Sequence, residues 1–115
     1  MTLDSLSPKH ETHHHLKRLL ELVKPDDSLL LMMQGSPDPD AIASAMALRE
    51  ILQREKGLSR YVFASTEPFR RQQNREFAYA MRIIIRPMSQ VDVSGFRLIA
   101  LIDAQPSFFS EPYKI

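Results

Sequence analysis

Two aspartates on either side of a proline are the residues of this sequence best placed to do chemistry. Asp38 and Asp40 lie in the segment 34–40, which reads Gln-Gly-Ser-Pro-Asp-Pro-Asp. Its two prolines stiffen the turn, because each restricts the residue before it to extended backbone. The apolar run 29–33 precedes the turn and the small-residue run 41–48 follows it, which predicts a strand, a turn and a helix. Open α/β sheets bind ligands at the carboxyl ends of their strands, so this turn is a predicted site.

A third aspartate, Asp103, directly follows another apolar run, 98–102. If that run pairs in parallel with 29–33, all three aspartates converge at one edge of the sheet. Three carboxylates in one place repel each other without a cation, and Mg²⁺ and Mn²⁺ prefer such oxygen ligands. Two metal ions roughly 3.5–4 Å apart would clamp a phosphoryl group and activate a water for in-line attack. Asp38, Asp40 and Asp103 are therefore the predicted catalytic and metal-binding residues.

Each of these residues also has a simpler structural interpretation. Asp38 or Asp40 would serve equally well as a cap for the helix that follows the turn. Asp103 would serve equally well as the first residue of a turn after its strand. Ser44, one turn into the helix, is either a ligand of a substrate phosphate or a small packing residue.

Helical and strand patterns alternate along the chain. A first helix is expected to begin at Pro8 and to end at Pro25, and a second to run from the acidic turn to Gly57. A third helix is expected to start in 65–68, and a turn or short helical fragment is expected at 91–95. The expected strands follow the apolar and β-branched runs 29–33, 61–64, 83–85 and 98–102.

This order of elements predicts an α/β fold of three layers, with a mostly parallel sheet and helices on both faces. The two most apolar strands, 29–33 and 98–102, are expected to lie centrally. We expect one domain over 1–115, with a leading helix in 1–27 and alternating strands and helices in 28–115.

The composition fits a globular domain and excludes several kinds of site. The chain has 115 residues and a net charge of +1, which gives no electrostatic argument for a nucleic-acid surface. It has no cysteine, so disulfides and thiolate metal sites are excluded. No apolar run has the length of a membrane span or of a signal-peptide core, so the expected location is cytoplasmic.

Two clusters of side chains near helices have both a functional and a structural interpretation. The histidines at the start of the first helix would form either a metal cluster or an exposed helix face: they are His10, His13, His14 and His15. The arginines of the third helix would either meet phosphates or form a solvated face: they are Arg70, Arg71 and Arg75.

Two segments resemble motifs of the DHH phosphoesterase superfamily, which includes RecJ-like nucleases, oligoribonucleases and phosphoadenosine phosphate phosphatases. Segment 36–45, Ser-Pro-Asp-Pro-Asp-Ala-Ile-Ala-Ser-Ala, resembles the first motif, in which Asn-Pro-Asp, a spacer residue and Asp-Ala-Ile-Gly-Ser follow a histidine and a spacer. Segment 99–106, Ile-Ala-Leu-Ile-Asp-Ala-Gln-Pro, resembles the second motif, an aspartate that closes an apolar strand. The resemblance covers most of the chain and implies the amino-terminal part of a DHH phosphoesterase domain.

The resemblance implies a hydrolase that uses two Mn²⁺ (or Mg²⁺) ions on phosphate esters of nucleotides or short oligonucleotides. Asp38 and Asp40 would each ligate one metal ion, and Asp103 would bridge or support both. The position of the family's motif-opening histidine holds Gln34, whose neutral amide is a poorer ligand than imidazole.

The family's later sequence features are expected downstream of this chain. The Asp-His-His motif, a further aspartate and the glycine-rich substrate-binding domain do not occur before Ile115. We therefore expect the amino-terminal part of a longer enzyme, with little or no hydrolysis by this chain alone. Three aromatic residues near the end would normally pack against other parts of a protein. In this chain they are expected either to be exposed or to mediate association with another copy, as in a homodimer: they are Phe108, Phe109 and Tyr113.

Two other functions are open from the sequence. The first is a nucleotide-binding module or pseudoenzyme, which Gln34 and the missing motifs favour over catalysis. The second is a haloacid-dehalogenase-like phosphatase, in which an Asp-x-Asp follows a strand and its first aspartate is the nucleophile. In this chain 34–37 separate the apolar run from Asp38, and no downstream lysine and acid pair follows in the expected context.

Overall fold

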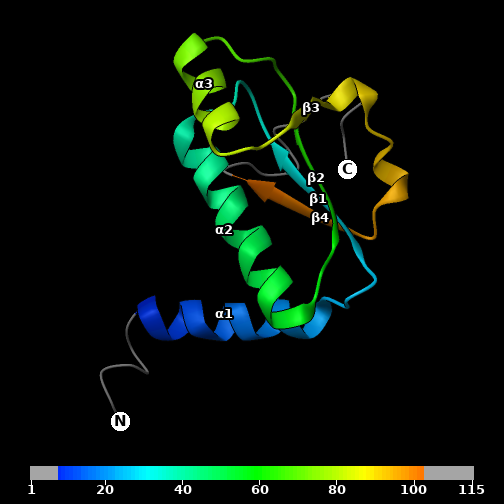
Figure 1. Ribbon diagram of the computed structural model, residues 1–115. Coiled ribbons are helices and arrows are strands. Elements are labelled where there is room, and N and C mark those ends of the chain that lie inside the picture. Colours follow the sequence, from blue (N-terminus) through cyan, green and yellow to red (C-terminus); the bar gives the residue numbers. More distant parts are fainter. Residues whose placement is uncertain (1–7, 103–115) are drawn as a thin grey trace.

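The computed structural model describes residues 8–102 and shows a four-stranded, all-parallel sheet with strand order β3-β2-β1-β4 (Figure 1). Side chains are described from His14 onward. The elements in chain order are α1 (Pro8–Leu22), β1 (Ser28–Met33), α2 (Pro39–Lys56), β2 (Arg60–Ser65), α3 (Gln72–Ala80), β3 (Ile85–Pro87), the 3-10 helices η2 (Met88–Gln90) and η3 (Val93–Gly95), and β4 (Leu98–Ile102).

The sheet is covered on both faces, which confirms the predicted three-layer α/β fold. Figure 1 shows α2 and α3 on one side of the strands and the 3-10 helices on the other, with α1 crossing the base of α2. Alternate residues of β1 divide between two apolar clusters. Leu31 and Met33 pack with residues of the α-helices, whereas Leu30 and Met32 pack with Met88 and its neighbours. Within residues 8–102 the second face is thus covered by short 3-10 helices rather than by an α-helix.

The strand order depends on which face of the sheet each connection between strands crosses. The connections through α2 and α3 take the chain in one direction, from β1 to β2 and then to β3. The chain then returns through η2 and η3 over the opposite face and places β4 on the far side of β1. Right-handed crossovers require this change of face when the direction reverses. The strands 29–33 and 98–102 pair in parallel, so the condition for convergence of the three aspartates at one edge of the sheet is met by the strands.

Three expectations from the sequence are corrected. In the described part of the chain β4 lies at the edge of the sheet, not in its centre. The third helix begins at Gln72, because β2 extends to Ser65 and residues 66–71 form a loop. The third strand is Ile85–Pro87 rather than 83–85, because only these residues pair with β2.

Candidate functional site

Asp38 caps the N-terminus of α2. Its backbone is extended, with φ −117° and ψ 168°, and its Oδ1 accepts a hydrogen bond of 2.8 Å from the N–H of Ala41. Pro39 follows in the first helical position, where its missing N–H costs no helical hydrogen bond. Within the part of the chain that the structure describes, Oδ2 of Asp38 has no hydrogen-bond partner. Capping occupies one oxygen of this carboxylate and leaves the other for a ligand.

The other predicted ligands of this turn are exposed to solvent. Gln34 directly follows β1, Asp40 lies in the first turn of α2, and Ser44 lies one turn further along the helix. All three are exposed. A ligand could therefore approach them without opening the core.

The donor atoms of the turn suit a hard divalent cation in their chemistry. Asp38 and Asp40 offer carboxylate oxygens and Gln34 an amide oxygen, the ligand types that Mg²⁺ and Mn²⁺ prefer. Between residues 8 and 102, however, no group of three or more metal-ligating side chains is close enough to hold an ion. The described residues therefore supply two of the three predicted carboxylates.

The pairing of β4 with β1 brings the end of the fourth strand to the acidic turn. Met33, the last residue of β1, lies opposite Ile102, the last residue of β4. The next residue in the sequence is Asp103, which lies outside the described residues, as do Phe108, Phe109 and Tyr113. β1 and β4 also mark the point at which the connections switch faces, and open α/β sheets bind ligands in the crevice at such a switch point.

The loop after β1 is joined to the loop after β2 by three hydrogen bonds. Gly35, whose φ of 85° favours glycine, donates its N–H to Oγ1 of Thr66 at 2.7 Å. The N–H of Thr66 donates to the carbonyl of Met33 at 3.1 Å, and the N–H of Glu67 donates to the carbonyl of Gly35 at 3.3 Å. The two loops therefore form one continuous rim at the carboxyl end of the sheet.

Two further contacts hold the middle of the acidic turn. The backbone N–H of Arg70 donates to Oγ of Ser36 at 3.0 Å, and Nδ2 of Asn74 donates to the carbonyl of Pro37 at 3.2 Å. Sequence reasoning missed the supporting roles of Thr66 and Asn74. The sequence pattern that could have identified Thr66 is the one that identified the acidic turn: polar residues directly follow a buried strand, which for Thr66 is β2.

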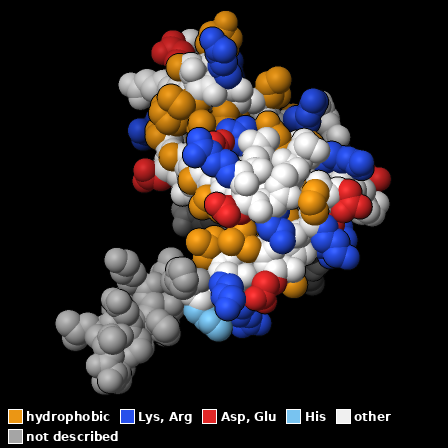
Figure 2. All heavy atoms as spheres, turned by 60° about the horizontal axis from the view of Figure 1, so that its bottom comes forward, with side chains coloured by type: hydrophobic (Ala, Val, Ile, Leu, Met, Phe, Trp, Pro, Cys, Tyr) orange, Lys and Arg blue, Asp and Glu red, His pale blue; other side chains and the backbone are white. Residues whose placement is uncertain are grey.

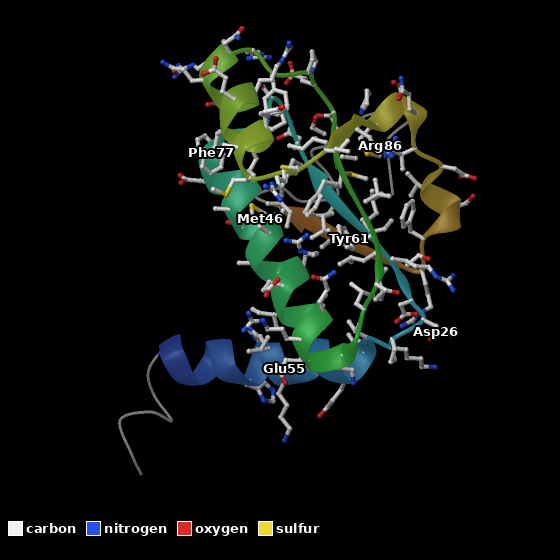
Figure 3. The ribbon with its side chains drawn as sticks, viewed as in Figure 1. Asp26, Met46, Glu55, Tyr61, Phe77 and Arg86 are labelled. Carbon is white, nitrogen blue, oxygen red and sulfur yellow. The ribbon has the colours of Figure 1, made fainter. Side chains whose placement is uncertain are left out.

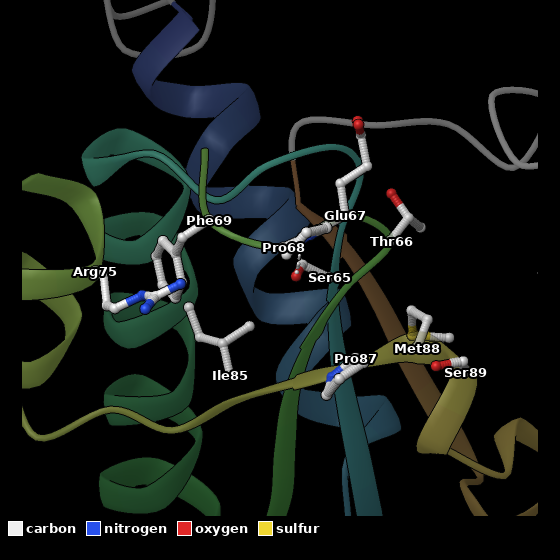
Figure 4. Close-up of a pocket in the computed structure, with 10 residues that line it drawn as sticks. All are labelled: Ser65, Thr66, Glu67, Pro68, Phe69, Arg75, Ile85, Pro87, Met88 and Ser89. Carbon is white, nitrogen blue, oxygen red and sulfur yellow. Dashed lines mark hydrogen bonds between the residues drawn. The ribbon is translucent and has the colours of Figure 1, made fainter. Parts of the chain in front are cut away.

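A pocket of about 370 Å³ lies beside this rim, at the carboxyl ends of β2 and β3. Neither Asp38 nor Asp40 is among its lining residues, so the pocket is a neighbour of the acidic turn rather than part of it. Ser65 at its base is 5% exposed and donates its Oγ to the carbonyl of Glu67 at 2.8 Å. Figure 4 shows the lining residues, which are Ser65, Thr66, Glu67, Pro68, Phe69, Arg75, Ile85, Pro87, Met88 and Ser89.

The pocket combines an apolar wall with a cation. Arg75 reaches from α3 toward Phe69 and Ile85 (Figure 4). Glu67, the acidic residue of the lining, forms an ion pair with Arg70. Elsewhere Lys and Arg are interspersed with Asp and Glu on the face that Figure 2 displays, in keeping with the net charge of +1. An apolar wall beside an arginine suits an anion that carries an apolar group.

The histidines of the first helix do not form a metal centre within the described residues. His14 and His15 are exposed, with ring centroids 6.3 Å apart. No described group of three metal-ligating side chains includes them. The side chains of His10 and His13 lie outside the described ones.

Comparison with known proteins assigns no family to the chain. No protein-family model matches it, and no solved structure matches it significantly. A protein of Methanocaldococcus jannaschii, named only as uncharacterized, is 30% identical over 95 residues, which cover 79% of this chain and 20% of that protein. The chain thus spans about a fifth of the length of this curated relative. In the described part of the chain, no helix is long and apolar enough to cross a membrane.

Proposed function

We propose that this chain is the amino-terminal part of a metal-dependent phosphoesterase of the DHH type. Its substrates are phosphate esters of nucleotides or short oligonucleotides, hydrolysed with two Mn²⁺ or Mg²⁺ ions in a cytoplasmic enzyme. The proposal rests on the resemblance of 36–45 and 99–106 to the two family motifs.

The structural observation that best supports the proposal is the pairing of β1 with β4. The parallel pairing of β1 and β4 places Met33 opposite Ile102, so the strands that lead into the two motifs end side by side. The motifs are more than fifty residues apart in sequence, and the resemblance requires them to meet. A sheet order that separated these strands would have removed the basis of the proposal.

In such a site, different residues of this chain would bind the metal ions, position the turn and contact the substrate. Asp38 and Asp40 would hold the metal ions together with Asp103, and the metal ions would activate the attacking water and neutralise the phosphate. Gly35 and Thr66 fix the turn between β1 and α2, so the carboxylates are held before a ligand arrives. The neighbouring pocket, with Phe69 and Arg75, has the size and the lining to receive the organic part of a substrate.

A binding module without catalysis is the second candidate. Asp38 uses one carboxylate oxygen as a helix cap, and Gln34 stands where the family motif has a histidine. Both observations favour binding over turnover for this chain by itself. Binding of a nucleotide without release of phosphate would identify this function.

The proposal is tested by calorimetric titration of the chain with Mn²⁺. We expect saturable binding that Asp38→Asn and Asp40→Asn each weaken by about tenfold or more, because each removes a charged ligand. Asn is as good a cap as Asp, so Asp38→Asn keeps the helix start.

Asp92→Asn is the matched control for this titration. Asp92 also caps a short helix, with Oδ1 accepting from the N–H of Ser94 at 3.1 Å, but it lies before η3 rather than in the acidic turn. This variant should bind Mn²⁺ as the unchanged chain does. Absence of saturable binding, or equal losses in all three variants, would overturn the proposal.

A further inference from the structure

A second pocket, of about 340 Å³, lies away from the acidic turn and is rich in arginine. It opens beside the amino-terminal half of β2, where the sheet edge is uncovered because β3 pairs only with Phe63–Ser65. Its lining residues are Arg49, Ser59, Tyr61, Val62, Phe63, Arg82, Ile83, Ile84 and Arg86. The lining residues thus include three arginines and no acidic residue.

Arg49 is fixed in place at this pocket. Its guanidinium carbon lies 5.2 Å from the ring centroid of Tyr61 and 5.8 Å from that of Phe63, and its Nη1 donates to the hydroxyl of Tyr61 at 3.1 Å. Figure 3 labels Tyr61, on the side of the sheet that α2 covers. The Nε of Arg49 is buried and has no hydrogen-bond partner among the described residues. Buried donors are rarely left unsatisfied, so this N–H is an exception within the described residues.

Arg82 is held at the same pocket in a conformation that favours glycine. It has a φ of 58° and ends α3 in a Schellman motif, in which its N–H donates to the carbonyl of Tyr79 and the N–H of Ile83 donates to that of Ala78. Gly57, with a φ of 70°, occupies the left-handed position after α2. An arginine in such a position is strained, and strain of this kind clusters at functional sites.

None of the three arginines forms an ion pair with another described residue. The acidic side chains paired within residues 8–102 are Glu50, Glu67 and Asp27, and their partners are other arginines. Arg82 and Arg86 are exposed, and Ile84 beside them is 73% exposed. Because arginines and no acidic residue line this pocket, an anion bound there would gain electrostatic stabilisation.

We propose that this pocket binds a phosphate group, either free or as part of a small phosphate monoester. Arginine guanidinium groups match phosphate oxygens in geometry and form charge-assisted hydrogen bonds with them. The pocket is larger than a phosphate ion needs, and Val62 and Ile84 give it an apolar wall. The proposal is independent of the metal site, because this pocket shares no lining residue with the one beside the acidic turn.

The test is an NMR titration of the chain with inorganic phosphate and, in a second series, with phenyl phosphate at constant ionic strength. We expect saturable shifts of the backbone amides of Tyr61, Arg82 and Arg86, with those of Gly35 and Thr66 unchanged. Tighter binding of phenyl phosphate would identify a monoester as the ligand, and equal binding would identify free phosphate.

Two variants separate a binding role of the arginines from a structural one. Arg82→Gly relieves the backbone strain, so it should raise the midpoint of thermal unfolding while it weakens phosphate binding by about tenfold. Arg86→Gln should weaken binding similarly with unchanged stability, because Arg86 is exposed (labelled in Figure 3). Arg18→Gln is the control, since Arg18 is exposed on α1 outside the pocket. No saturable shift at these amides, or equal affinities of all three variants, would overturn the proposal.

Discussion

Asp38 has an observed role in the fold, and the proposed metal site would give it a second role. Its Oδ1 holds the N–H of Ala41 and so satisfies one of the free donors at the start of α2. Among the described residues, neither its second oxygen nor the carboxylate of Asp40 has a hydrogen-bond partner, and the proposed cation would bind these oxygens. The sequence located this turn correctly, but which of its aspartates caps α2 depends on where the helix begins. Local sequence signals leave a helix start uncertain by a residue or more.

The capping role gives a prediction for stability. Asp38→Ala removes the acceptor for Ala41 and should lower the free energy of unfolding by about 1 kcal/mol. Asp38→Asn keeps an acceptor at the same position and should unfold within a few tenths of a kcal/mol of the unchanged chain. Urea denaturation followed by circular dichroism measures both. If Asp38→Ala were as stable as the unchanged chain, the cap would contribute nothing to α2.

Among the helices and strands, the sequence predicted correctly the boundaries that nearby residues determine. β4 begins at Leu98 as expected, and α2 runs from the acidic turn to Gly57, because apolar runs, prolines and glycines set these boundaries. The start of α3 was misplaced because Pro68 resembles a first helical residue. Residues 66 and 67 instead bond to the loop after β1, a non-local contact that no local pattern encodes.

The third strand was misplaced for a similar reason. Ile83 and Ile84 belong to an apolar run, yet Ile83 turns into the core at 9% exposure while Ile84 is 73% exposed. The left-handed residue Arg82 sets this path, and strand pairing starts only at Ile85. An arginine in a position that favours glycine is not visible from sequence periodicity.

The junctions before β1 and β4 are tied by one buried carboxylate. Asp27 is 6% exposed, and its Oδ2 accepts from Nη2 of Arg97 at 2.6 Å and from the N–H of Lys24 at 2.7 Å. Arg97 also donates to the carbonyl of Leu22, so it links the end of α1 to the start of β4. The hydrogen bond from Arg97 lowers the pKa of Asp27 from 3.8 to about 2, against the opposing effect of burial.

This shift predicts a pH dependence of stability. A lowered pKa in the folded state means that the stabilisation is complete above the unfolded pKa of 3.8 and is lost as the pH falls through about 2. Asp27→Asn should therefore be less stable than the unchanged chain at neutral pH. The difference should shrink as the pH falls from 3.8 toward about 2, because the unchanged chain then also loses its charge.

Thermal unfolding midpoints of both chains across this pH range check the prediction. Asp26→Asn is the control, because Asp26 is the exposed neighbour of Asp27 in the sequence. A constant difference between Asp27→Asn and the unchanged chain from neutral pH to about 2 would rule out the ion pair as its cause.

At the scale of the whole molecule, the sheet order has the largest consequence for function. The sequence left open whether 29–33 and 98–102 are neighbours, and the structure pairs them in parallel. The preference for right-handed crossovers explains why the chain passes to the other face of the sheet before β4. It did not reveal the pocket at β2 and β3 or the arginine-lined pocket, since each gathers residues from several elements. The fold class and the parallel sheet could be inferred from patterns, whereas the position of β4 and the cavities depend on how the elements and side chains pack.

The most direct test of the metal site is to locate Mn²⁺ by its paramagnetic broadening of backbone amide signals. Substoichiometric Mn²⁺ should broaden the amides of Gly35 and Ala41, on either side of the acidic turn, before those of Gly57 at the far end of α2 and Gly95 in η3. Broadening centred on His14 and His15 would place the ion on the first helix. That result, or no selective broadening, would contradict a metal site at the carboxyl ends of β1 and β4.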